Sequence, residues 1–388
     1  MARLQILVSG AGIAGCTLAY WLARSGHSVT VVERSGTLRS SGSPVDVRGP
    51  AVEVVERMNV ATQLRKARIQ VKGMTLLDTA GRQMTRVNLE ALRSSIVPKD
   101  MELARGELAR ILHEASTNDV DYVFGDSIRT LAQDEAGVDV TFEHARARRF
   151  DLVVGADGLH SMVRRLVFGP DSELVRHAGL FAATIALPGP NDLEDEMFML
   201  NTPGKLVALH PCQGKPLAYF VFWHPEIPEF DYTNLDQHKD ILERTFAGMG
   251  WRVPEFLDAV RAAPDMYFDS VARVDVANWS RGRIVLLGDA SSCVSLFGDG
   301  STLAIAGAYE LAKALTESPA DPATAFSRYQ VVHGRLVASK QKNLVSTASR
   351  IVPRTSTGIW LSARVFWRAM AGVAATMRLV RKLQGKSS

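Results

Sequence analysis

Short apolar runs and a helical pattern alternate at the start of the chain. Residues 4–9 form an apolar run that ends at Gly10, residues 13–25 repeat apolar positions with helical spacing, and residues 28–32 form a second apolar run. Uninterrupted apolar runs of this length are typical of parallel strands buried on both faces. The three segments therefore predict a strand–helix–strand unit, the smallest module of a parallel sheet.

The middle of the chain changes to strands in close succession. Four such segments, at 180–187, 196–200, 206–210 and 217–223, predict an antiparallel sheet. Elsewhere the pattern predicts helices at 51–66, 102–116, 236–248, 253–262, 301–315 and beyond Pro322, strands within 71–87, a hairpin at 138–150, buried strands at 151–154 and 283–287, and a loop at 35–50.

The order of these segments predicts an α/β fold. We expect a Rossmann-like domain with an inserted antiparallel β-sheet domain for the substrate, followed by a C-terminal helical segment. The predicted Rossmann-like domain is discontinuous and comprises residues 1–70, 98–177 and 270–320. The substrate domain comprises 71–97 and 178–269, and the helical region 321–388.

Composition narrows the class of protein. The chain has 388 residues, of which 46% are hydrophobic and 22% charged, which excludes global disorder. Three scattered cysteines do not form a disulfide framework, and the nine histidines lack metal-ligand spacing, so no metal site is expected. The sequence has no secretory leader pattern and no apolar stretch of about 18 residues, so we predict a cytoplasmic protein.

Basic charge is concentrated at the C-terminus. From Arg335 to Ser388 the chain has 11 basic and no acidic side chains, which leaves a net charge of −7 before it. Trp360 and Trp367 lie in this tail, as in helices that bind membrane surfaces. The alternative, which we favour, is packing against the rest of the chain. No binding of nucleic acid is expected.

A glycine motif follows the first predicted strand. Gly10-Ala11-Gly12-Ile13-Ala14-Gly15 has the spacing at which a tight turn brings the backbone and a helix N-terminus to a pyrophosphate. Glu33, 23 residues after Gly10, ends the second strand, where a carboxylate accepts hydrogen bonds from ribose hydroxyls. The pattern predicts a bound dinucleotide and leaves NAD(H) and FAD open.

Two later segments decide between these cofactors. They are Gly155-Ala156-Asp157-Gly158, continuing to Arg164, and Gly288-Asp289-Ala290 after a strand. With the first motif, their order and spacing resemble the FAD-dependent aromatic hydroxylases, the group A flavoprotein monooxygenases of the para-hydroxybenzoate hydroxylase fold. Within that family the sequence looks most like the branch that includes the tetracycline-inactivating monooxygenase.

The resemblance implies roles for individual residues. Gly10 to Gly15 and Glu33 would hold the ADP half of FAD, with Arg34 beside the adenine. Arg105 would contact the flavin side, Asp289 the ribityl chain, and Asp46 would lie near the flavin ring. Asp157 would act through its surrounding backbone, and Gly298, Gly300, Ser301 and Thr302 would bring a helix N-terminus to the flavin. Arg39 would bind the phosphate of NAD(P)H.

The substrate site is less well defined by the sequence. Residues 291–299 depart from the usual family pattern, because Ser291-Ser292-Cys293 follows Asp289 and Asp299 stands where glutamine is common. Phe220 and Phe222 alternate with Tyr219, Val221 and Trp223, so one of the two sets faces the ligand. We name Phe220, Phe222 and His210 as candidate substrate contacts.

The resemblance implies an enzyme whose chemistry is carried by FAD, without catalytic side chains. NAD(P)H would reduce FAD, O2 would give a flavin C4a-hydroperoxide, and an aromatic or polyketide-like, antibiotic-like molecule would be hydroxylated. Two alternatives stand beside it: a flavin oxidoreductase of the same fold acting on a lipid or prenyl group, and a flavin- or ligand-binding protein without turnover. The sequence leaves monomer and homodimer open.

Overall fold

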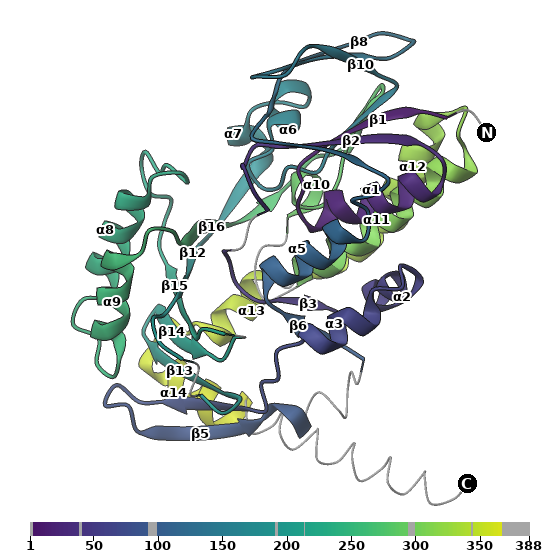
Figure 1. The fold of residues 1–388 in the computed structure, drawn as a ribbon. Helices are drawn as coiled ribbons and strands as arrows, with labels where there is room; N and C mark the ends of the chain where they lie inside the picture. Colours follow the sequence, from purple (N-terminus) through teal and green to yellow (C-terminus); the bar gives the residue numbers. More distant parts are fainter. Residues whose placement is uncertain are drawn as a thin grey trace, which may run out of the picture.

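A six-stranded, mostly parallel sheet forms the centre of the first lobe (Figure 1). The computed structural model describes residues 3–38, 41–91, 99–190, 193–212, 214–293, 299–342 and 344–366. The strand order is β17 (Ser280–Arg281), β18 (Ile284–Leu286), β11 (Leu152–Gly155), β1 (Gln5–Ser9), β2 (Ser28–Glu33) and β7 (Asp121–Phe124). Neighbouring strands are parallel except β17 and β18.

Both faces of this sheet are covered, which explains its uninterrupted apolar strands. Helices on one face are α1 (Ile13–Arg24), α5 (Arg105–Glu114), α11 (Asp299–Glu317) and α12 (Pro322–Gln341). The other face packs against α6 (Met162–Val167) and a three-stranded meander of β8 (Ile128–Gln133), β9 (Val138–Phe142) and β10 (Arg148–Phe150). The side chains of β1 alternate between these two cores, with Ile6 and Val8 in one and Leu7 in the other.

A seven-stranded sheet forms the second lobe. Its order is β16 (Tyr267–Val274), β12 (Val175–Ala186), β15 (Leu217–Trp223), β14 (Lys205–His210), β13 (Glu196–Thr202), β4 (Gly73–Leu77) and β5 (Gln83–Asn88). Only the β13–β4 pair is parallel. One face packs against α8 (Leu235–Phe246) and α9 (Val253–Ala262), whereas the opposite face turns toward the first lobe.

The C-terminal segment packs on the second sheet as far as it is described. It comprises α13 (Leu344–Ile351), α14 (Ser356–Leu361) and a π-helical turn at Ser362–Phe366. Trp223 Nε1 donates to the carbonyl of Val352 (2.7 Å), and the Arg354 guanidinium lies 3.7 Å from the Trp223 ring centroid. Trp367 lies outside the described residues. No helix in the described part of the chain combines the length and apolar character needed to cross a bilayer.

Three predicted elements have different bounds in the structure. The helix predicted at 51–66 is two helices, α2 (Pro50–Arg57) and α3 (Ala61–Ala67), because Asn59 between them has a φ of 60°. The helix predicted from residue 102 begins at Arg105, after strand β6 (Met101–Leu103). That strand pairs antiparallel with β3 (Val45–Val47), which lies inside the predicted loop at 35–50. A three-residue strand is too short to show a period.

His333 of α12 is a buried imidazole with no role at the cavity described below. Its ring stacks on Tyr329 and lies edge-on to Trp279, and a methyl group added to Gly307 of α11 would be 2.7 Å from its Nε2. That nitrogen has no hydrogen-bond partner among the described residues. Burial disfavours the charged imidazolium and lowers the pKa of His333 from 6.5 to about 4.

His333 makes the free energy of unfolding depend on pH in the mildly acidic range. Above pH 6.5 the imidazole is neutral in both states, but between pH 6.5 and about 4 only the unfolded chain gains the proton. The free energy of unfolding should therefore fall across that range by about 3 kcal/mol from this group. Urea denaturation at several pH values tests this, with His333→Gln as the comparison. An unchanged slope in the variant would contradict it.

Candidate active site

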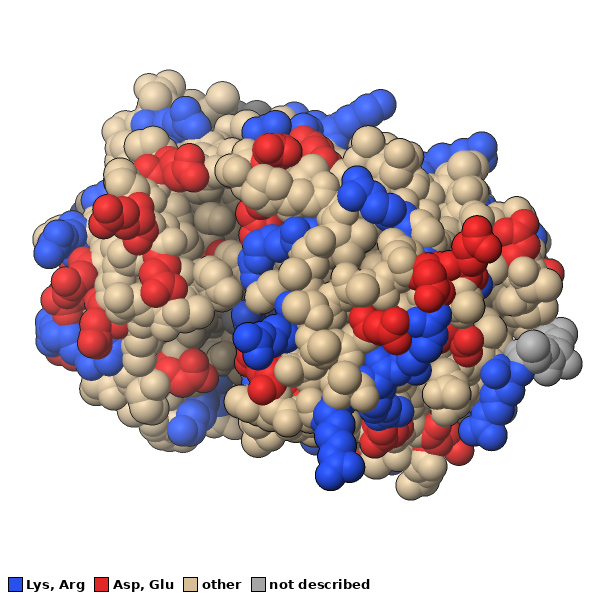
Figure 2. All heavy atoms as spheres, turned by 90° about the horizontal axis from the view of Figure 1, so that it is seen from above, with Lys and Arg blue, Asp and Glu red and all other residues tan. Residues whose placement is uncertain are grey.

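A cavity of about 760 Å³ lies between the two lobes. On one side it is lined by loops at the carboxyl ends of β1, β2 and β11, where ligands bind in open α/β sheets. On the other side it is lined by β13, β14 and β15. Figure 2 shows a hollow in this face of the molecule, with basic side chains along one wall. The first lobe thus offers a dinucleotide site that opens toward the sheet of the second.

The glycine loop has the geometry of a pyrophosphate cradle. Gly10 has a φ of 103° and lies close to the segment Gly155–Gly158. A Cβ added at Gly10 would lie 2.6 Å from the carbonyl oxygen of Ala156. Helix α1 starts after Gly12 without a side-chain cap, and Gly12, Ile13 and Ala14 line the cavity. Its first-turn N–H groups are therefore available to an anion.

Glu33 holds this loop while facing the cavity. Its carboxylate accepts hydrogen bonds from the backbone N–H of Ala11 (2.8 Å) and of Ser35 (3.0 Å). Ala11 and Arg34 line the cavity beside it. Since a carboxylate has about four acceptor sites, Glu33 can also accept from ribose hydroxyls, as the sequence analysis predicts.

Asp157 binds its own chain through its side chain. Oδ2 accepts from the backbone N–H groups of Met162 (2.8 Å) and Val163 (3.1 Å), and Oδ1 accepts from the Ser161 hydroxyl. Burial raises the pKa of Asp157, and these hydrogen bonds oppose the rise. Asp157 therefore fixes the turn before α6, which agrees with a role through the surrounding backbone.

A fully buried arginine connects the two later motifs. Arg164 Nη1 donates to the carbonyl of Ala290 (3.1 Å), and Nη2 donates to the carbonyl of Leu159 and to Asp171 (2.7 Å). Ala290 follows Asp289, and Leu159 follows Gly158. No separate role was predicted for Arg164. Its fixed spacing from Asp157 was the one feature of the sequence that pointed to it.

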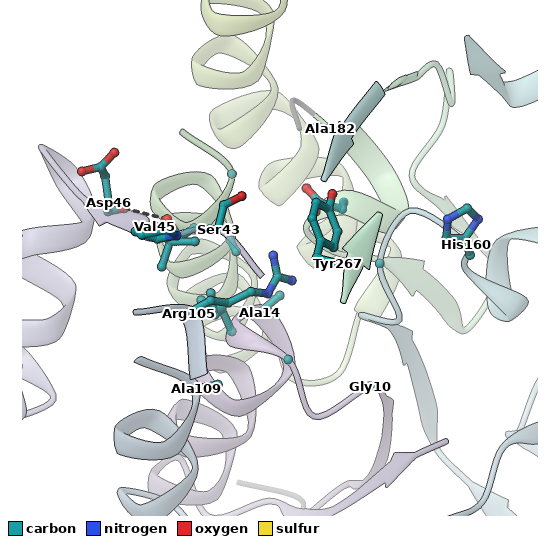
Figure 3. A pocket seen from close by; sticks show the side chains of 18 of the residues that line it. Gly10, Ala14, Ser43, Val45, Asp46, Arg105, Ala109, His160, Ala182 and Tyr267 are labelled. Atoms are coloured by element: carbon teal, nitrogen blue, oxygen red, sulfur yellow. Dashed lines mark hydrogen bonds between the residues drawn. The ribbon is translucent and has the colours of Figure 1, made fainter. Parts of the chain in front are cut away.

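Arg105 and Asp289 approach the cavity from different elements. Figure 3 shows the Arg105 guanidinium directed into the cavity between Ser43 and Tyr267. Burial raises the pKa of Asp289, and the positive charge of Arg105 lowers it in part. The guanidinium of Arg105 and the carboxylate of Asp289 therefore influence each other at the cavity.

The N-terminus of α11 is fixed by hydroxyl groups. Ser301 Oγ and Thr302 Oγ1 donate to the Asp46 carbonyl, at 2.6 and 3.0 Å, and the Asp46 carboxylate pairs with Arg48 at 2.6 Å. Gly300, Ser301 and Asp46 line the cavity. These two side chains position the N-terminal turn of α11 at the cavity. Gly298 and Arg39 lie outside the described residues.

Of the three candidate substrate contacts, one lies at the cavity and two lie elsewhere. His210 lines it, and its Nε2 lies 3.0 Å from Glu102 Oε1. The prediction that Phe220 and Phe222 contact the substrate is wrong, because both are buried in the core beneath α8 and α9. The alternate set lines the cavity, with Tyr219 and Val221 on that face of β15. Alternation defines two faces of a strand, but the helices decide which face is covered.

A contact between the lobes was not predicted from the sequence. Tyr232 stacks on His160 with a centroid separation of 3.6 Å, and Arg34 lies over the same tyrosine at 5.6 Å. His160 Nε2 in turn lies 2.9 Å from Asp269 Oδ2. The first three of these residues line the cavity. They come from segments far apart in sequence, and no local pattern links them.

The fold and this site together define a dinucleotide-binding protein of the α/β class. The model of the FAD binding domain family matches residues 3–324. A flavin-dependent monooxygenase of Legionella longbeachae is 31% identical over 343 residues, which cover 88% of this chain and 87% of that protein. FAD-dependent monooxygenase asL4 of Sarocladium schorii is 31% identical over 80% of this chain and 75% of that one.

A solved structure extends the similarity to the whole fold. The crystal structure of tetracycline destructase Tet(51) superposes with a TM-score of 0.83 at 30% identity, covering 96% of this chain and 98% of that one. The chain belongs to the FAD-binding monooxygenases of the aromatic hydroxylase family. This confirms the predicted family, the α/β fold class and FAD as cofactor.

The residues present fit FAD on structural grounds. A Cβ added at Gly12 would meet nothing within 4 Å, so the space over the loop is open where a pyrophosphate must approach. The described residues hold no group of three or more His, Cys, Asp or Glu side chains placed to bind a metal ion. Gly12, Glu33, Arg105 and Asp289 would hold FAD, which supplies the redox chemistry.

Proposed function

We propose that this protein uses NAD(P)H and O2 to hydroxylate an aromatic or polyketide-like small molecule. The observation that carries the proposal is the continuity of the cavity. The same space is lined by Gly12, Glu33 and Asp289 on one side and by Met197 and Tyr219 on the other. A substrate on the second sheet would therefore meet the cofactor directly.

The chain's own residues would position and shield the reactants. The walls from β13, β14 and β15 would shield the reacting atoms from water and favour a planar apolar body, while Arg105 and the N-terminus of α11 would provide positive potential on the flavin side. In the balanced reaction, NAD(P)H, a proton, O2 and substrate give NAD(P)+, water and hydroxylated substrate. One oxygen atom enters the substrate and the other leaves as water.

Absorbance spectroscopy of the FAD-loaded protein tests the proposal. NADPH or NADH added without oxygen should bleach the flavin bands, and a suitable ligand should accelerate the bleaching by about tenfold or more. Tetracycline is the first ligand to test, because the similar Tet(51) is called a tetracycline destructase. Admitting O2 should then give a product heavier by one oxygen atom in mass spectrometry.

Controls separate the alternatives. If no member of a panel of polycyclic phenols promotes oxidation of NAD(P)H, the binding protein without turnover is favoured. Acceleration by prenylated lipids, together with co-sedimentation with vesicles, would favour the lipid oxidoreductase. Reduction without oxygen transfer would contradict the monooxygenase proposal for that ligand.

A further inference from the structure

We propose that Glu102 determines substrate specificity by accepting a hydrogen bond from a hydroxyl or similar donor on an uncharged planar aromatic substrate. The same carboxylate would repel substrates that present a carboxylate of their own at this position. This inference rests on the proposed function, because it names the substrate class of that cavity.

Glu102 lies opposite another acidic residue on the ribbon between the lobes. In the β3–β6 pair, Asp46 is the direct cross-strand partner of Glu102, and both residues line the cavity. Like charges directly opposite each other destabilise a strand pair. Arg48 neutralises Asp46 at 2.6 Å, whereas Glu102 is paired with His210 at 3.0 Å. The arrangement places acceptor capacity at the wall of the cavity at a cost to local stability.

The His210 pairing fixes the direction of one hydrogen bond. An ionised carboxylate only accepts, so Nε2 of His210 donates to Glu102 and holds its orientation. His210 is only 4% exposed, and its Nδ1 has no partner among the described residues. Because both residues line the cavity, this hydrogen bond orients the carboxylate at the ligand side.

The Tyr219 hydroxyl feels the charge of Glu102 and belongs to a group of linked hydroxyls. Ser43 Oγ lies 2.8 Å from Thr184 Oγ1, and Ser43 also shares a hydrogen bond with the Tyr219 hydroxyl. Burial raises the pKa of Tyr219 well above its usual value, and the charges of Glu102 and Asp46 add to the rise. The phenol therefore stays protonated and remains a hydrogen-bond donor in this group.

Apolar side chains on other walls of the cavity select the shape of the substrate. Tyr219 and the apolar side chains beside it line the cavity from β4, β13, β14 and β15, namely Met74, Met197, Met199, Leu206 and Val221. Methionine side chains adapt to flat aromatic surfaces and contact them favourably. A planar apolar body with a hydrogen-bond donor at one edge satisfies both parts of the wall.

Binding of a matched pair of probes tests the inference without turnover. Naphthol and naphthoic acid with the same substitution position are titrated into FAD-loaded protein at neutral pH, in the absence of NAD(P)H. Binding is followed through the flavin absorbance and by calorimetry. We expect naphthol to bind about tenfold more tightly, as one hydrogen bond to a charged acceptor provides. A preference below about threefold, or one for naphthoic acid, would overturn the inference.

Variants show whether the preference resides in Glu102. In Glu102→Gln the preference should fall by about fivefold or more, because the charge is gone. Glu90→Gln makes the same charge change at an exposed residue outside the cavity wall and should leave it unchanged. If Glu102→Gln fails to retain FAD, Glu102→Asp, which keeps the charge, must preserve the preference. If the ratio of naphthol affinity to naphthoic acid affinity is the same in Glu102→Gln and Glu90→Gln, the role assigned to Glu102 is overturned.

The two proposals fail in different experiments. Loss of the naphthol preference while NAD(P)H still bleaches the flavin would remove only the role of Glu102. A clear preference in a protein that no nicotinamide nucleotide reduces would remove the proposed reaction and leave the ligand class standing.

Discussion

Arg164→Met is expected to lower the free energy of unfolding by about 2 to 4 kcal/mol, because it leaves two buried carbonyl groups without their donor. The Arg164 side chain has no exposed area, and it donates to the carbonyls of Ala290 and Leu159 as well as to Asp171. Methionine fills a similar volume but leaves both carbonyls without this donor. Urea denaturation of the FAD-free protein, followed by circular dichroism, measures the loss.

The neighbouring arginine provides the control for this prediction. Arg165 pairs with the same Asp171 at 3.0 Å, but its side chain is 30% exposed. Arg165→Met should therefore cost no more than about 1 kcal/mol. FAD affinity should fall in Arg164→Met, because Leu159 and Ala290 belong to the two later FAD motifs. Equal losses in the two variants would show that Arg164 does not join the motifs energetically.

Gly12→Ala is expected to weaken FAD binding by about a hundredfold or more while the FAD-free protein remains folded. Gly12 has an extended backbone (φ −78°, ψ −173°) that alanine adopts readily, and its added Cβ would meet nothing within 4 Å. That open space is where the pyrophosphate must approach the backbone. Fluorescence titration of the FAD-free protein with FAD measures the affinity.

Gly15→Ala separates this cofactor effect from a folding effect. A Cβ at Gly15 would lie 1.9 Å from the carbonyl oxygen of Gly10, so helix α1 must move away from β1. This variant should lose stability even without FAD, whereas Gly12→Ala should keep the parent melting temperature within about 2 °C. A large drop in the melting temperature of Gly12→Ala would contradict the interpretation of that position.

The first lobe was predicted well because its signals are local. Apolar runs, the glycine spacing and Glu33 lie within one strand–helix–strand unit, and β1, α1 and β2 follow the predicted segments closely. Much of the second sheet was also predicted, because β13, β14 and β15 are apolar runs of strand length, whereas β16 lies outside the predicted segments. The short ribbon of β3 and β6 was not, since three residues carry no readable period.

The sequence by itself determined a dinucleotide-binding protein and most of the elements, because backbone geometry at a glycine loop depends on near neighbours, and the resemblance of the two later motifs added FAD as the expected cofactor. Only the tertiary structure decided which face of β15 lines the cavity, since α8 and α9 cover Phe220 and Phe222 and leave Tyr219 at the ligand side. It also brought Glu102 to His210, and Tyr232 to His160, across 108 and 72 positions of the chain. Such contacts depend on how separate layers pack together, a long-range property that periodicity within one segment does not contain.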